Sequence, residues 1–222
     1  YPKNTKIEAL SGGAVWLLTE TEGAIRIDTN SEDYSLTSQW YSAQSGQFSA
    51  TRVFGVYEDL LGNEWILSDN GLGMLTAGQT TPTSYFVDAA EREKKGGQAF
   101  YSCLEYNSEI YFGSDNGRVW CYQKENGQFQ LQNLPASSRI VSINSVEGNE
   151  LIFTTAKDGF FSYQPKTKAI EHFPASRFPN ASIHSVYVDK ASEVWFEQHI
   201  PGTVVNFNPR TRILKQEKVP NY

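Results

Sequence analysis

Short apolar runs separated by turn residues follow one another along the whole chain. Between residues 53 and 75, apolar runs of four to seven residues alternate with turn segments at 59–63 and 69–71. Runs of this length, bounded by glycine, asparagine and aspartate, predict β-strands joined by tight turns. The pattern therefore predicts short antiparallel strands and not amphipathic helices.

A tandem repeat underlies this pattern, because an aromatic residue is followed six or seven positions later by a glycine in five places. The steps between successive aromatic residues are 49, 46, 42 and 42 residues, a period typical of propeller blades or helical solenoids. The five pairs are Trp16/Gly23, Trp65/Gly71, Tyr111/Gly117, Phe153/Gly159 and Trp195/Gly202.

The turn residues between the two apolar runs of each unit favour strands. Ser-Asp-Asn-Gly stands at 68–71 and again at 114–117, at the same place in its unit. Asn-Gly between apolar runs predicts a tight hairpin, whose primed turn needs positive φ at both central residues. The first and fifth units carry one more residue and predict a looser turn, but all five keep the glycine.

Each unit also contains an apolar run before the aromatic strand and a weaker run after the glycine strand, such as 84–87, 129–131 and 170–173. Four short antiparallel strands in a repeat of this length are typical of a propeller blade. The 17 Gly, 9 Pro and 14% aromatic content argue against helical repeats. The sequence predicts an all-β fold, a β-propeller or partial (open) propeller of about five four-stranded blades.

We expect one array over residues 1–222, with approximate blades at 1–37, 38–88, 89–134, 135–174 and 175–222. Both ends then coincide with blade boundaries. The alternatives are a five-bladed ring closed by face packing and an open arc, and the arc is favoured. An arc would expose apolar faces that predict a partner or a second copy. Because the chain starts at Tyr1 and enters the first repeat almost at once, we interpret it as a fragment of a longer ectodomain.

Composition narrows the function classes. Lys and Arg total 19 against 25 Asp and Glu, and the net charge of -6 weighs against sequence-independent nucleic-acid binding. Cys103 and Cys121 are expected on the first and third strands of one blade, roughly 9 to 10 Å apart, which is too far for a disulfide. The sequence predicts two free thiols that act as small buried apolar residues.

No catalytic residue, metal site or cofactor is predicted. The histidines His172, His184 and His199 have no metal-ligand spacing, and no nucleophile-elbow pattern surrounds any serine. Glu58 and Asp59 have the residue types of glycosidase carboxylates, but their place between two strands favours a role in capping the turn. The Asp-Asn-Gly segments at 69–71 and 115–117 lack the further acidic ligands of a calcium loop and are interpreted as turns.

Ligand binding is the more plausible activity, at two places. Arg52, Gln98, Arg139 and His184 are expected near the start of the first strands of their blades, where loops form the ligand face of a propeller. A guanidinium there suits a uronate or a sulfate. The alternative is that the arginines only solvate the rim.

The second place is Trp40-Tyr41, in the polar stretch 38–47. Exposed aromatic rings are stacking platforms for sugars, and the alternative is that both rings pack beneath a loop.

An acidic pair at 58–59, a Gly-Asn turn at 62–63, a Trp-Ile strand at 65–66 and an Asn-Gly-Leu turn at 70–72 follow one another in this chain. This order resembles the two-component regulator propeller repeat. The resemblance is strong over 53–75, fair over 110–120, weaker over 147–161 and 188–205, and poor in the first unit. Propellers of that family have seven blades, whereas five units are present here, which leaves ring closure open.

The resemblance implies the periplasmic sensor region of a Bacteroides-type hybrid two-component sensor histidine kinase. It implies an oligosaccharide ligand derived from a polysaccharide, contact with the remaining blades of the parent chain or with a second copy, and membrane attachment only through that parent. Any kinase chemistry would then lie elsewhere in the parent. The alternatives are a propeller lyase or glycosidase that acts on carbohydrate, and a non-catalytic interaction scaffold.

Overall fold

The computed structural model describes residues 4–30, 33, 38–86, 99–180, 182–183, 185–198 and 202–218. These residues contain no α-helix, and their helical content is limited to the 3-10 turns Asp115–Gly117 and Ala175–Arg177. The predicted all-β class is confirmed.

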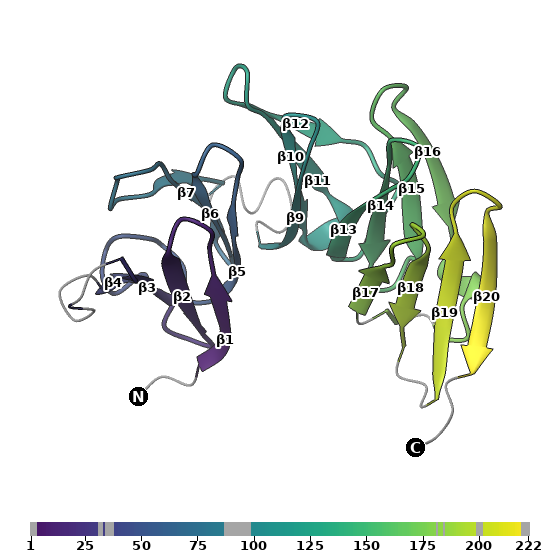
Figure 1. Ribbon diagram of the computed structural model, residues 1–222, viewed down its shortest axis with the longest axis horizontal. Coiled ribbons are helices and arrows are strands. Elements are labelled where there is room, and N and C mark those ends of the chain that lie inside the picture. The colour runs from purple at the N-terminus through teal and green to yellow at the C-terminus, as the bar shows by residue number, and fades with distance from the viewer. Residues whose placement is uncertain are drawn as a thin grey trace. The chain divides into compact units, whose positions relative to one another are not determined.

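Strands in the described parts form five four-stranded antiparallel sheets, and each sheet takes four strands that are consecutive in the chain (Figure 1). The first sheet contains β1 (Asn4–Ala9), β2 (Ala14–Thr19), β3 (Ala24–Asp28) and β4 (Ser38–Tyr41). The second contains β5 (Val53–Glu58), β6 (Glu64–Ser68), β7 (Gly71–Leu75) and β8 (Thr83–Tyr85). The third contains β9 (Phe100–Tyr106), β10 (Glu109–Ser114), β11 (Val119–Gln123) and β12 (Gln128–Gln132). The fourth contains β13 (Ile140–Val146), β14 (Glu150–Thr155), β15 (Phe160–Gln164) and β16 (Ala169–Phe173). The fifth contains β17 (Ser185–Val188), β18 (Val194–Glu197), β19 (Thr203–Asn208) and β20 (Ile213–Lys218).

The chain divides into two compact units, Tyr1–Tyr101 and Ser102–Tyr222. Unit 1 holds the first two sheets, and unit 2 holds the fourth and fifth sheets and most of the third. A single array over the whole chain stays a prediction.

One predicted blade boundary is wrong, because Ser38–Tyr41 belongs to the first sheet and not to the second. This segment is β4, in which Trp40 pairs with Ile25 of β3. Its polar surroundings made it resemble a loop, but the fourth strand of each sheet needs little apolar sequence. The outermost strand β20, for example, is almost entirely exposed.

The repeat glycines are explained by the backbone of the hairpin between the second and third strands. All five have positive φ, a conformation that side chains other than glycine adopt at a cost. At 116–117 both residues have positive φ, +60° and +70°, as a primed turn requires. The expectation fails at 70–71, where φ is positive only at Gly71. There the glycine follows a two-residue loop and pairs with Ser68, as in a type I turn with a glycine bulge.

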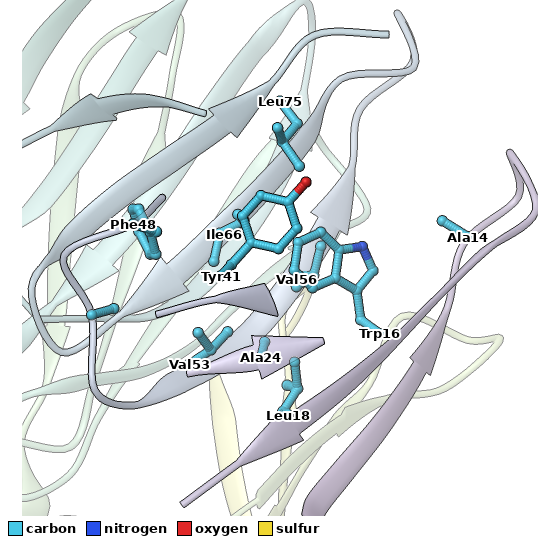
Figure 2. Packing of buried hydrophobic residues seen from close by; sticks show 11 residues of the cluster. Ala14, Trp16, Leu18, Ala24, Tyr41, Phe48, Val53, Val56, Ile66 and Leu75 are labelled. Atoms are coloured by element: carbon cyan, nitrogen blue, oxygen red, sulfur yellow. The ribbon is translucent and has the colours of Figure 1, made fainter. Parts of the chain in front are cut away.

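Neighbouring sheets within unit 1 pack face to face through the repeat aromatic. Trp16 of β2 is fully buried and lies 5.0 Å from the ring of Tyr41, measured between centroids. Val56 and Ile66 of the second sheet belong to the same cluster (Figure 2). Packing of bulky rings between sheets is therefore confirmed for this pair.

Unit 2 contains two further clusters of this kind. Tyr111 of the third sheet joins Phe153 of the fourth, and Phe160 of the fourth joins Phe207 of the fifth. The repeat aromatics at 16, 65, 111 and 153 are all fully buried. Cys103 and Cys121 lie on β9 and β11, as predicted, and they form no disulfide with each other. Cys121 is buried as expected, whereas Cys103 is only half-buried.

The fifth unit departs from the predicted repeat. Gly202 has the expected positive φ of +69°, but it is half-buried, whereas the repeat glycines at 23, 71, 117 and 159 are buried. Trp195 is also half-buried. Val194 and Phe196 on either side of it join the cluster with the fourth sheet, so Trp195 points to the opposite face, on which the described part of unit 2 has no further sheet. Gly202 therefore keeps the backbone conformation of the other repeat glycines, but Gly202 and Trp195 are less buried than their counterparts. The looser turn predicted before Gly202 falls at 199–201, outside the described residues.

Candidate functional site

Both predicted ligand-binding arginines directly precede the first strand of a sheet. Arg52 comes directly before β5, and Arg139 comes directly before β13. Their backbone carbonyls accept hydrogen bonds from the N–H of Asp69 at 3.0 Å and of Ala156 at 2.8 Å. Both arginines are exposed. They hold equivalent positions in their own sheets, one in each unit, and ligand binding by them stays a prediction.

A turn aspartate holds each of these segments in place. Asp158 accepts hydrogen bonds from the N–H groups of Ser137 and Ser138 at 2.9 and 2.7 Å, and from their hydroxyls. Burial raises the pKa of Asp158, but these hydrogen bonds outweigh burial and hold the pKa below its ordinary value. Asp69 accepts from the N–H groups of residues 51 and 52 at 3.1 and 3.2 Å. Both aspartates thus position the backbone on which the predicted arginines stand.

The predicted aromatic platform is reduced to one ring. Tyr41 is fully buried against Trp16, and its hydroxyl lies 2.9 Å from the side-chain oxygen of Gln39. Burial raises the pKa of Tyr41 to about 12. Tyr41 is therefore a core residue that cannot stack on a ligand, which corrects the prediction. Trp40 is 38% exposed, and its stacking role stays a prediction.

Gln98 and His184 lie outside the described residues. His172 is described, on β16, where its ring stacks on Phe161 with centroids 4.3 Å apart and planes 8° apart. Its Nε2 lies 2.7 Å from the carbonyl oxygen of Asp158. These contacts tie His172 to the hairpin of its own sheet.

The acidic pair has structural partners. Asp59 accepts hydrogen bonds from the indole N–H of Trp65 at 3.0 Å and from backbone N–H groups of the turn that follows it. Glu58 accepts a hydrogen bond from the hydroxyl of Ser11 at 2.6 Å, and this bond lowers its pKa. The predicted turn-capping role of Asp59 is confirmed.

The same indole–carboxylate pair recurs in the fifth sheet, where Trp195 donates to Asp189 at 2.9 Å. Both pairs are six residues apart, across the turn between the first and second strands. The hydrogen bond from Trp195 lowers the pKa of Asp189. In Asp59, burial raises the pKa, but the hydrogen bonds from Asn63 and Trp65 outweigh it and lower the pKa.

Asp59→Asn is expected to weaken the dependence of stability on acid pH. Because the folded pKa of Asp59 lies below its unfolded value, its contribution is complete above about pH 4 and is lost as the pH falls through the folded pKa. The variant should lose about 1–2 kcal/mol at pH 7 and progressively less below pH 4. Urea unfolding at several pH values measures this. A constant difference between the two proteins from pH 7 to pH 2.5 would contradict it.

Several carboxylates make contacts between neighbouring sheets that the sequence did not indicate, and Glu64 and Glu150 are the two least exposed examples with an arginine partner. Glu64 of the second sheet accepts from the indole N–H of Trp16 at 2.7 Å and from the guanidinium of Arg26 at 2.7 and 2.9 Å. Glu150 of the fourth sheet accepts from Arg212 of the fifth at 2.5 Å. Glutamate begins the second strand in three of the five units and directly precedes it in a fourth, which is the signal that could have found them.

One pocket of about 370 Å³ lies in unit 2, beside the edge strand β20. Another, of about 280 Å³, lies at the turns of the third sheet and includes Glu109 and Lys124. Lys124 forms an ion pair with Glu105 there.

Within the described residues, no cluster of three His, Cys, Asp or Glu side chains suits a metal ion. No helix among those residues is long and apolar enough to cross a bilayer. Sequence reasoning missed the first pocket, which is lined by Arg177, Phe178, Pro179, Val205, Leu214, Lys215 and Gln216.

No protein-family profile matches the chain, and no curated protein matches it in sequence. Among solved structures, the β-propeller domain of Myceliophteria thermophila Cps50 (Swd1) is 14% identical with a TM-score of 0.67, and the match covers 98% of this chain and 74% of that one. The fold is a β-propeller or part of one.

Two more propeller-like structures match over nearly the whole chain. The extracellular domain of the putative hybrid two-component system BT4673 from B. thetaiotaomicron is 16% identical with a TM-score of 0.76, and the match covers 100% of this chain. This chain spans about a third of that domain, 31% of its length. Virginiamycin B lyase from Staphylococcus aureus is 17% identical with a TM-score of 0.72, over 97% of this chain and 69% of the lyase. At such identities, the likeness shows the fold alone.

Proposed function

We propose that this chain is a ligand-sensing portion of the periplasmic propeller of a hybrid two-component sensor histidine kinase, and that it responds to an oligosaccharide released from a polysaccharide. The observation that carries the proposal is the match over the full chain to the extracellular domain of a hybrid two-component system. The repeat at 53–75, which resembles the two-component regulator propeller repeat, supports it independently. The remaining blades of the parent chain, or a second copy, would then be its partners.

A sensor transmits a signal only if its ligand binds one of two conformations more tightly. The contacts between sheets through Glu64 and Glu150 offer a physical basis for such states, because each carboxylate joins two sheets through directional bonds. A ligand that changes the packing of neighbouring sheets would break or tighten these bonds. This chain would contribute binding and packing changes, and the parent chain would contribute any phosphoryl transfer.

A propeller lyase is the second candidate, because virginiamycin B lyase matches this chain over nearly its whole length. Turnover separates the two candidates. A sensor releases its ligand unchanged, whereas a lyase acting on carbohydrate converts it into products.

Incubation of the chain with size-fractionated digests of plant and host polysaccharides is expected to raise its melting temperature with at least one fraction. At a ligand concentration 100 times the Kd, binding to the folded state adds about 2.7 kcal/mol, which for a chain of this size corresponds to roughly 5–10 °C. Differential scanning calorimetry measures the shift, and anion-exchange chromatography of the same sample shows whether the sugars are converted.

Stabilisation with unchanged sugars supports the sensor. New unsaturated or hydrolysed products favour the enzyme. Absence of both effects across all fractions contradicts the sensor and leaves the interaction scaffold.

A further inference from the structure

The pocket of about 370 Å³ beside β20 combines positive charge with an apolar floor. It lies between the segment that follows β16 and the last two strands of the fifth sheet. Phe178 is 7% exposed and Val205 is 2% exposed, so both side chains are fixed in the core beneath it. Among the described residues, Arg177 contributes the charge and Gln216 a neutral amide, and no carboxylate lines the pocket. The side chain of Lys215 points to the opposite face of β20, because Lys215 pairs with Asn206 and not with Val205.

The charge at this pocket is not neutralised by the surrounding protein. The guanidinium carbon of Arg177 lies 5.1 Å from the centroid of the Phe173 ring. A cation–π contact restrains the guanidinium and leaves its N–H donors available. Among the described residues, the structure gives the side chain of Arg177 no hydrogen bond or ion pair. An unpaired cation on this pocket contrasts with the net charge of -6 of the chain.

Arg212 shows what a structural arginine looks like at nearly the same place. Its guanidinium carbon also lies 5.1 Å from the centroid of Phe173. Unlike Arg177, it is paired with Glu150 and Glu171. The protein therefore satisfies one of the two guanidinium groups on this ring and leaves the other facing a pocket.

We propose that this pocket binds an acidic sugar, with the carboxylate of a hexuronate on Arg177. A guanidinium forms paired hydrogen bonds with a planar carboxylate, which a point-like ammonium cannot do. Pro179 and Leu214 offer apolar surface to the C–H face of a pyranose ring, and the amide of Gln216 can bond to a hydroxyl. The volume is at the lower end of the range for small-molecule sites and suits one or two sugar rings. The inference deepens the proposed sensing role and rests on it for its biological meaning.

Titration of the isotopically labelled chain with sodium galacturonate, digalacturonate, galactose and sodium acetate tests this, with binding followed by amide NMR shifts. Galacturonate and digalacturonate are expected to shift the amide signals of residues 177, 178 and 214–216 saturably. Galactose should not do so, and acetate should bind more weakly. Arg177→Ala should weaken uronate binding by about tenfold or more, because a hydrogen-bonded ion pair is lost. Arg210→Ala is the matched control, since Arg210 is an exposed arginine paired with Glu147 in the same unit.

Equal weakening by Arg177→Ala and Arg210→Ala overturns the site, as does the absence of saturable uronate shifts at residues 177 and 178. Arg177→Lys keeps the test valid if Arg177→Ala fails to fold, and it should weaken uronate binding without loss of the native spectrum, because an ammonium cannot form the paired hydrogen bonds. Uronate binding here with no response to any polysaccharide digest would retain the site and refute the proposed function. Binding of a polysaccharide digest that is unchanged in Arg177→Ala would refute the site and retain the proposed function.

Discussion

Gly159→Ala is expected to destabilise unit 2 by at least about 3 kcal/mol. Gly159 has φ of +85°, where an alanine is strained by about 1–2 kcal/mol. A Cβ at this position would also lie 2.1 Å from the carbonyl oxygen of Phe173 and 2.8 Å from the amide nitrogen of Ala175. These are backbone atoms at the end of β16, so they cannot move aside as a flexible side chain can. Urea unfolding followed by tryptophan fluorescence measures the loss.

Gly148→Ala separates the steric effect from the backbone strain. Gly148 lies in the same unit with φ of +87°, but nothing lies within 4 Å of the position of its Cβ. This variant should lose only about 1 kcal/mol. Similar losses in both variants would show that close packing of the outer strand against the hairpin glycine is not what requires glycine at 159.

The same geometry explains how much of the fold the sequence could predict. Gly23 repeats the arrangement of Gly159, since a Cβ there would lie 2.1 Å from the carbonyl oxygen of Tyr41. One requirement of the backbone therefore recurs in different sheets and produces a glycine at a regular distance from the strand aromatic. Because this constraint is local, the hairpins, the strand order and the all-β class could be predicted from spacing alone.

Features that depend on a neighbouring sheet could not be predicted in this way. Tyr41 and Trp40 are adjacent and equally aromatic, yet one is fully buried and the other is 38% exposed. Which ring faces the second sheet depends on the register of β4, and the polar residues around it gave no sign of a strand. The pocket at Arg177 was missed for a related reason. It brings together residues 177–179 and 214–216, which lie far apart in the chain and belong to no repeat motif.

Glu64→Ala is expected to destabilise unit 1 by about 3 kcal/mol, the second large effect. Glu64 is the common acceptor for the Trp16 indole and the Arg26 guanidinium, and the side chains of Arg26 and Glu64 are 27% and 12% exposed. Removal of the carboxylate leaves a largely buried cation and a buried indole N–H without this acceptor, which costs more than the ion pair itself contributes. The guanidinium of Arg26 cannot escape this penalty by losing its proton, because the ordinary pKa of arginine is far above neutral pH even without Glu64.

Two further variants show whether the loss of stability in Glu64→Ala comes from the removed charge and from the burial of the ion pair. Glu64→Gln keeps an acceptor for the indole but removes the charge, so its loss should lie between zero and that of Glu64→Ala. Glu147→Ala removes the same number of atoms from an ion pair with Arg210 whose side chains are 55% and 70% exposed, and it should cost no more than about 0.5 kcal/mol. Equal losses for Glu64→Ala and Glu147→Ala in urea unfolding would mean that the first two sheets are held by apolar packing alone. The Trp16–Glu64–Arg26 contact would then have no part in coupling them.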